Sequence, residues 1–220
     1  TDCVSDYVIP SYTTTLTALL DPPTHTTTTF KMTALIQLET VGCSYLPATR
    51  DELTKIEERV PKQWLTSLGH TSETSVDTAL FNLQQSAIVH FAGHGTQDVM
   101  NPHDSGLILS NGQLKVSQIM HLPEESQDAT LELSRKGMSL ALLSACKTAD
   151  EAMHLAATLL FAGFRGVVGT MWTITDHVGP KVADAFYEYL FRNCDCTSDP
   201  PITPNLTEVT CALHLAVTKL

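Results

Sequence analysis

Several short runs of this chain are apolar on both sides of an extended strand, and this pattern most constrains the fold. The strand candidates are Thr33–Leu38, Ala87–Phe91, Gly106–Leu109, Leu140–Ser144 and Gly166–Trp172, and several of them, such as the run from Leu140 to Leu143, show this pattern. A strand that is apolar on both sides has to be covered by helices on both sides, which is typical of parallel sheets. The sequence therefore predicts an α/β fold, with a mainly parallel β-sheet and helices on both faces.

Helical patterns alternate with these strands. The first helix is expected to open at Thr49 with Glu52 as a capping box and to end at Pro61, because proline disrupts a helix interior. A second has Thr74 and Asp77 near its start. The others are expected over His154–Phe164, from Pro180 onward and from Asn205 onward. We interpret the threonine-rich segment before residue 30 as strand and loop.

Composition narrows the class of protein. The chain has 220 residues, a net charge of −11, 43% hydrophobic and 17% charged residues, which indicates one soluble globular domain over residues 1–220. The negative charge makes nucleic acid an unfavourable partner. No apolar run of membrane-spanning length and no leader are visible, so we expect no membrane association. Six irregularly spaced cysteines favour a reducing, cytoplasmic location. Because the chain lacks an initiator Met, we expect a piece of a longer protein.

Two of the most apolar strands run directly into reactive side chains. Ala87–Phe91 is followed closely by His94, which glycines flank, and Leu140–Ser144 is followed by Cys146. Ligands of parallel sheets bind beyond the carboxyl ends of the strands. If these two strands are neighbours, the imidazole and the thiol meet at the same edge.

A thiol beside an imidazole is the minimal equipment for acyl transfer. The thiolate attacks a carbonyl carbon, and the imidazolium protonates the leaving amine. His94 and Cys146 are therefore the candidate catalytic pair. The backbone N–H groups of Gly95 and Cys146 are candidate oxyanion donors.

Five segments resemble the CHAT domains, the caspase- and separase-like peptidases of clan CD. The segments are Asp6-Tyr-Val-Ile-Pro-Ser-Tyr12, Leu46-Pro-Ala-Thr-Arg-Asp-Glu52, His90-Phe-Ala-Gly-His-Gly95, Leu143-Ser-Ala-Cys-Lys-Thr148 and Phe161-Ala-Gly-Phe-Arg-Gly-Val-Val-Gly-Thr-Met-Trp172. The resemblance covers almost the whole chain. It implies a caspase-like fold, His94 as general acid and base, and Cys146 as nucleophile. It also implies that this is the C-terminal domain of a longer protein, behind tetratricopeptide repeats.

The resemblance also suggests where a substrate binds. Asp176 follows the strand after the nucleophile, a region that lines the specificity pocket in relatives, so it is the first candidate for binding a basic P1 side chain. Asp98 and Asp104, after the histidine loop, are weaker candidates. A surface-turn aspartate is an equally good interpretation of Asp176.

Other residues have simpler interpretations. His90 lies inside its strand and fits a structural histidine. Cys194, Cys196, Cys211 and His214 have a spacing that could hold zinc, but we expect no metal and no cofactor. We interpret His103, His121, His154 and His177 as surface or helix-end residues. The capping role of Asn205 accounts for its glycosylation sequon.

We expect a cysteine endopeptidase that acts on a protein or peptide substrate and is gated by domains outside this chain. The alternative is a caspase-like binding or scaffold module with weak or no catalysis. The segment 148–153 keeps this alternative open, because many relatives carry a longer loop there. A small-molecule acyl transferase or hydrolase using the same pair is a third hypothesis.

Overall fold

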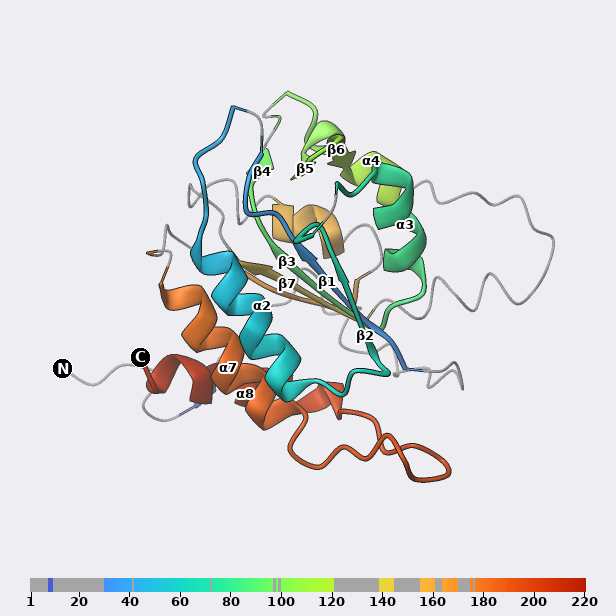
Figure 1. The fold of residues 1–220 in the computed structure, drawn as a ribbon, viewed down its shortest axis with the longest axis vertical. Helices are drawn as coiled ribbons and strands as arrows, with labels where there is room; N and C mark the ends of the chain where they lie inside the picture. The colour runs from blue at the N-terminus through green and yellow to red at the C-terminus, as the bar shows by residue number, and fades with distance from the viewer. Residues whose placement is uncertain are drawn as a thin grey trace.

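Helices and strands alternate along the described part of the chain (Figure 1). The structure is a computed structural model, and it describes residues 8–9, 30–40, 42–71, 73–96, 98, 100–120, 139–144, 155–160, 164–169, 175 and 177–220. The strands are β1 (Met32–Ile36), β2 (Leu65–Leu68), β3 (Ile88–Ala92), β4 (Gly95–Thr96), β5 (Gly106–Leu109), β6 (Gly112–Lys115), β7 (Leu140–Ser144) and β8 (Gly166–Val168). The helices are α2 (Ala48–Arg59), α3 (Val76–Gln84), α4 (Val116–Met120), α7 (Val178–Leu190) and α8 (Val209–Thr218), with 3₁₀ turns at Pro102–Asp104 (η2) and Leu206–Glu208 (η3).

Five strands form the central sheet in the order β2-β1-β3-β7-β8, and every neighbouring pair is parallel. The strands most buried on both sides, β1 and β3, lie at its centre. A small antiparallel sheet, β4-β5-β6, continues from the carboxyl end of β3. The expected α/β fold with a mainly parallel sheet is confirmed.

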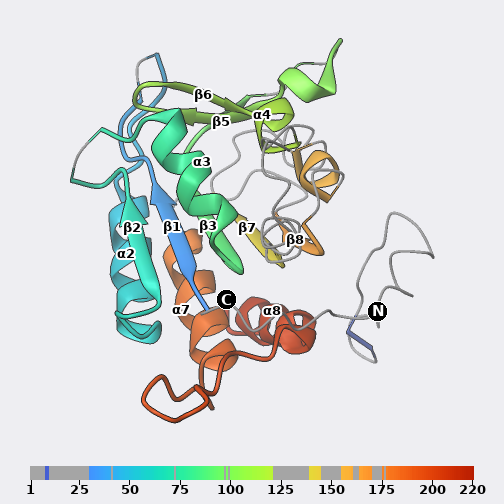
Figure 2. The ribbon, with the colours of Figure 1, turned by 90° about the vertical axis from the view of Figure 1, so that its right-hand side faces the viewer.

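Two separate apolar cores lie on the two faces of the central sheet. On one face, α2, α7 and α8 cover β1, β3 and β7, with the aromatic rings of Phe186 and Tyr187 fully buried. On the other face lie α3, the β5–β6 hairpin, α4 and the helical residues 155–160. Figure 2 shows the sheet between these layers. Helices on both faces follow from strands that are apolar on both sides.

Some local expectations need correction. Strands β2, β4 and β6 were not anticipated, because their residues are only partly buried or mixed in polarity. The N-cap of α3 is Ser75, whose side chain accepts from the Thr78 backbone N–H. Helix α7 begins two residues before Pro180. The Asn205 side chain accepts from the Thr207 backbone N–H, as expected of a cap. The threonine-rich segment lies almost entirely outside the described residues.

The expected capping box of the first helix is wrong. Helix α2 begins after Pro47, which makes no side-chain cap, and the Thr49 hydroxyl donates to the Leu46 carbonyl instead of capping a backbone N–H. Glu52 points into the protein and is only 3% exposed. Its carboxylate contacts side chains of the central sheet instead of the start of the helix.

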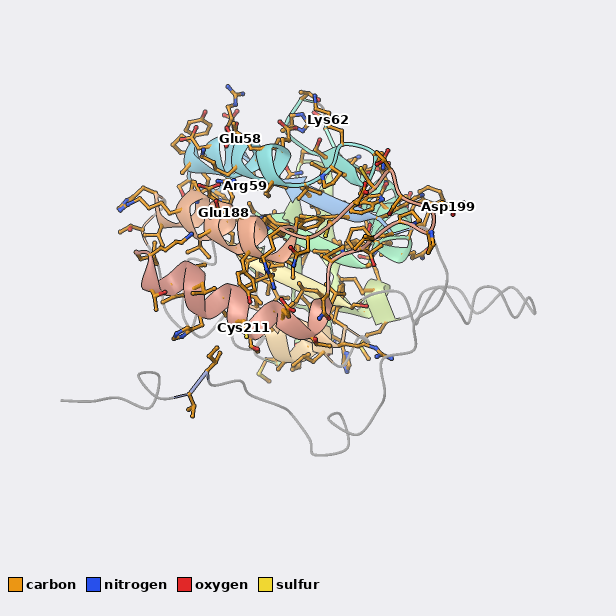
Figure 3. The ribbon with its side chains drawn as sticks, turned by 90° about the horizontal axis from the view of Figure 1, so that it is seen from below. Glu58, Arg59, Lys62, Glu188, Asp199 and Cys211 are labelled. Carbon is orange, nitrogen blue, oxygen red and sulfur yellow. The ribbon has the colours of Figure 1, made fainter. Side chains whose placement is uncertain are left out.

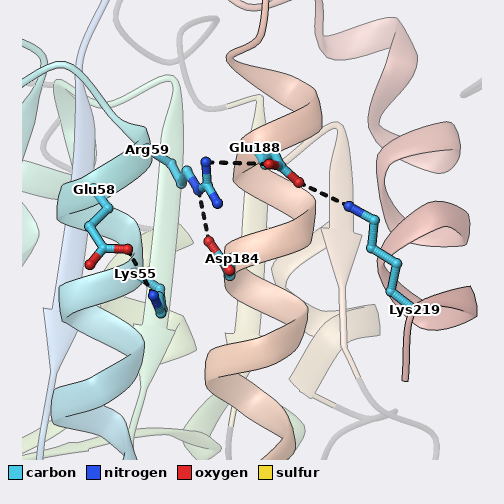
Figure 4. Close-up of polar contacts among 6 residues, drawn as sticks. All are labelled: Lys55, Glu58, Arg59, Asp184, Glu188 and Lys219. Atoms are coloured by element: carbon cyan, nitrogen blue, oxygen red, sulfur yellow. Dashed lines mark hydrogen bonds and ion pairs between the residues drawn. The ribbon is translucent and has the colours of Figure 1, made fainter.

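A chain of surface ion pairs ties the three helices of one layer together. Figure 3 shows α2, α7 and α8 side by side, with Arg59 next to Glu188. In Figure 4 the Arg59 guanidinium lies 2.7 Å from Asp184 and 3.3 Å from Glu188, and Glu188 is 2.9 Å from Lys219. Partly exposed pairs of this kind contribute about 1 kcal/mol or less each. The apolar core, rather than these pairs, therefore holds the layer on the sheet.

Candidate active site

Strands β3 and β7 are direct neighbours and run parallel. Their register pairs Ile88 with Leu140 at one end and Ala92 with Ser144 at the other. His94 comes two residues after Ala92, and Cys146 comes two residues after Ser144. The Gly93 backbone N–H donates to the Ser144 carbonyl oxygen at 3.4 Å, so contact between the two strands continues past their last paired residues.

His94 is buried, with 3% of its surface exposed, and one of its ring nitrogens has a defined partner. Its Nε2 lies 2.8 Å from the backbone carbonyl oxygen of Ser44, in the loop between β1 and α2. A carbonyl oxygen can only accept, so Nε2 carries the proton. In the neutral ring the lone pair is then on Nδ1, the nitrogen that can take a proton from a nucleophile. This arrangement fixes both the tautomer and the ring orientation that a general base needs.

Glycine is required directly before this histidine. A Cβ atom at Gly93 would lie 2.9 Å from the Gln37 Cβ and 3.0 Å from the Phe91 ring, both in the packed interior. After it, Gly95 begins β4, and the backbone N–H of Ile108 donates to the His94 carbonyl oxygen. The histidine is thus held from both sides along the chain, by the central sheet and by the small one.

For three of the predicted site residues, Cys146, Asp176 and Gly95, the predicted role is not tested by the structure. Cys146 and Asp176 lie outside the described residues, so the thiol and the first specificity candidate stay predictions. Gly95 is described, and its role as an oxyanion donor also stays a prediction. His121 and His154 also lie outside the described residues, so their interpretation as surface or helix-end residues stays a prediction.

Asp98 and Asp104, the weaker specificity candidates, both have partners close by, in their own loop and, for Asp104, also in β6. The Asp98 side chain accepts from the backbone N–H groups of Met100 and Asn101. Asp104 pairs with Lys115 at 2.8 Å and accepts from the Asn101 side chain, and Lys115 lowers the pKa of its carboxyl. These contacts give both carboxylates a structural task, and a substrate-binding role remains a prediction.

Sequence reasoning missed a buried polar network beneath this site. The Glu52 carboxylate accepts a hydrogen bond from the Ser144 hydroxyl at 2.9 Å and lies 3.0 Å from His90 Nε2. The Tyr187 hydroxyl lies 2.9 Å from His90 Nδ1. His90 is therefore a structural histidine, as the sequence suggested. The helical spacing of Glu52 relative to Leu53 and Ile56 could have indicated this, because it places the carboxylate on the apolar face of the helix. The structure shows all three residues buried.

The alternative zinc site finds no support. Across the described ranges, no three His, Cys, Asp or Glu side chains are grouped in a way that could hold a metal ion. Cys194, Cys196, Cys211 and His214 all belong to those ranges, and the first three are free thiols. Within the same part of the chain, no helix is both long and apolar enough to cross a membrane.

Comparison with known proteins identifies the family. The model of the CHAT domain matches residues 12–197, which is most of the chain and includes both strand ends described above. A search of curated proteins found no match. The order and direction of the central strands agree with a caspase-like arrangement. The chain therefore belongs to the CHAT domain family, whose fold is related to that of the clan CD cysteine peptidases.

Proposed function

We propose that this chain is a cysteine endopeptidase that cleaves a protein substrate through His94 and Cys146, gated by domains outside this chain. One observation carries the proposal. β3 and β7 are parallel neighbours in register at Ala92 and Ser144, and each candidate lies two residues beyond its strand. If this register continued for two more residues, position 94 would lie opposite position 146. The hydrogen bond of His94 Nε2 to the Ser44 carbonyl oxygen supports its proposed role as the base.

The proposed reaction follows from the tautomer of His94. Nδ1 takes the thiol proton of Cys146, and the sulfur attacks the scissile carbonyl carbon. The resulting oxyanion accepts from the backbone N–H groups of Gly95 and Cys146, which contribute about 3 kcal/mol each in comparable sites. The imidazolium then protonates the leaving amine as the C–N bond breaks. Water, deprotonated by the same ring, hydrolyses the thioester and releases Cys146.

Alkylation by iodoacetamide tests the pair. A thiolate beside His94 should make Cys146 react at pH 7 at least about 10-fold faster than the five other cysteines, as followed by peptide mass spectrometry. His94→Ala should remove this advantage, whereas Cys43→Ala should leave it unchanged. If Cys146 reacts no faster than Cys43, the pair is absent.

Cleavage of a peptide library, read by mass spectrometry, tests the endopeptidase itself. Cys146→Ala should abolish cleavage at a stability cost of about 1 kcal/mol, because it removes a single sulfur atom. Fast alkylation with no peptide cleaved would favour an acyl transferase of small molecules. Neither fast alkylation nor cleavage would favour the scaffold module.

We further propose that Asp176 selects a basic P1 residue. A buried guanidinium or ammonium needs a carboxylate partner, and breaking such a pair costs about 3–5 kcal/mol. Asp176→Asn should therefore lower cleavage after Arg or Lys by roughly 100-fold or more, while cleavage after apolar residues changes little. Comparison of the two peptide classes in the library measures this. An equal loss in both classes would rule out a specificity role.

A further inference from the structure

The buried network of Glu52, His90, Ser144 and Tyr187 draws side chains from four different elements. Glu52 comes from α2, His90 from β3, Ser144 from β7 and Tyr187 from α7. His90 precedes His94 by four residues, and Ser144 precedes Cys146 by two. A single carboxylate therefore contacts both of the strands that lead into the proposed catalytic pair.

We infer that Glu52 is a positioning residue, which aligns the carboxyl ends of β3 and β7 by holding Ser144 and His90 with its two oxygen atoms. Oε2 accepts from the Ser144 hydroxyl, and Oε1 faces His90 Nε2 at 3.0 Å. This inference rests on the proposed function, because alignment matters only if His94 and Cys146 react together. A misplacement of about 1 Å between reacting groups can cost about 100-fold in rate.

Packing alone does not account for a carboxylate at this place. Glu52 is 3% exposed and His90 is 1% exposed, so the pair is removed from water. Replacing a buried ion pair by apolar side chains of similar volume is often neutral or stabilising. An apolar residue at position 52 could therefore hold α2 on the sheet equally well. The carboxylate differs in having two acceptors at a fixed separation, each directed to another strand.

Tyr187, on the opposite side of His90 from Glu52, determines which groups of the network donate hydrogen bonds. Burial, and then the charge of Glu52, raise the pKa of Tyr187 well above its ordinary value. The phenol therefore keeps its proton and can donate to His90 Nδ1. The His90 ring proton then lies on Nε2, facing Glu52, although this contact is not aligned well enough to be a regular hydrogen bond. The Glu52 carboxylate therefore faces the dipole of a ring N–H at this contact, whereas its contact with Ser144 is a regular hydrogen bond.

Helix α7 closes over the Ser144–Glu52 contact. A Cβ atom at Gly179 would lie 2.9 Å from both the Glu52 Oε2 and the Ser144 Oγ. The absence of a side chain lets the helix backbone pack directly on this hydrogen bond. The contact is thus enclosed between the sheet and two helices.

The rate of Cys146 alkylation by iodoacetamide, measured on the whole chain at pH 7, tests the inference. Ser144→Ala removes one hydroxyl and its bond to Glu52, and the alkylation rate constant should fall between about 10-fold and 100-fold. Ser86→Ala is the matched control, since it too removes a serine hydroxyl that bonds a side chain of another element, that of Thr33 in β1 at 2.8 Å. The control should lower the melting temperature comparably but leave the rate within about twofold of the original chain.

Each outcome decides a different point. If Cys146 of the unmodified chain reacts no faster than Cys43, the proposed function fails and the inference fails with it. If Cys146 is reactive, and Ser144→Ala reacts like Ser86→Ala, only the inference is overturned. Glu52→Gln keeps the shape of the side chain and should also slow alkylation in a folded chain. Unfolding of both Ser144→Ala and Glu52→Gln would overturn the inference too, because the network would then hold the fold together rather than align the strands.

Discussion

At the scale of single residues, environment decides what each polar side chain can do. Two histidines four residues apart in the same segment have different partners. His94 contacts the backbone carbonyl of Ser44 through Nε2, whereas His90 has both of its ring nitrogens facing side chains, those of Glu52 and Tyr187. The same argument separates the cysteines, because a thiol reacts only as a thiolate.

Cys194 should be among the least reactive thiols of the chain. Burial raises its pKa from 9.0 to about 11. On the order of 0.1% of this thiol is then ionised at pH 8, so iodoacetamide should modify it more slowly than an ordinary exposed cysteine. Alkylation of each cysteine over time, followed by peptide mass spectrometry, measures this. Rapid modification of Cys194 in the folded chain would contradict the prediction, and denatured chain is the control.

At the scale of helices and strands, periodicity anticipated the elements with large apolar faces. The doubly apolar segments became β1, β3 and β7, and the expected alternation with helices is correct. Partly exposed strands were missed, since β2 has no fully buried residue to mark it. The threonine and glutamate at the start of α2 gave a misleading signal, because the capping-box pattern is local and says nothing of Ser144, which lies 92 residues further along the chain. Such long-range contacts depend on the fold, so the network could not be read from local spacing.

The start of α7 gives a prediction about the packing of this helix. Gly179→Ala should improve the helix by up to about 1 kcal/mol, since glycine is a poor helix former. The new methyl group would lie 2.9 Å from both the Ser144 hydroxyl and the Glu52 carboxylate and should push them apart. We therefore expect a chain of nearly unchanged stability whose Cys146 alkylates more slowly. Urea unfolding and alkylation rates on the same sample measure both. An unchanged alkylation rate would contradict the expected displacement of Ser144 and Glu52.

At the scale of the whole molecule, the buried phenol of Tyr187 predicts how stability changes at high pH. Its pKa is raised in the folded state, so the folded chain keeps a proton that the unfolded chain releases above about pH 10. This contribution is complete below that pH and is lost as the pH rises further. Cys194 acts in the same direction from about pH 9.

The free energy of unfolding should therefore fall with pH above about 10, and more steeply than in Tyr187→Phe. Urea unfolding at a series of alkaline pH values measures the two slopes. Tyr187→Phe should also lose about 1 kcal/mol at neutral pH, because the bond to His90 is removed. Tyr45→Phe, at an exposed position, controls for the loss of one tyrosine. Equal slopes in the chain and in Tyr187→Phe would contradict the prediction.

The position of His94 between two sheets has a consequence for engineering. Its carbonyl oxygen accepts from Ile108 in the small sheet, while the residue before it is bonded to the end of β7. A Cβ at Gly106 would lie only 2.1 Å from the Leu114 carbonyl oxygen, so the hairpin of β5 and β6 tolerates little change where it meets this joint. A chimera that takes the β5–β6 hairpin from another family member should therefore take the segment from Gly93 to Lys115 as one block. A cut after His94 would transplant Ile108 without the histidine whose carbonyl oxygen its N–H binds.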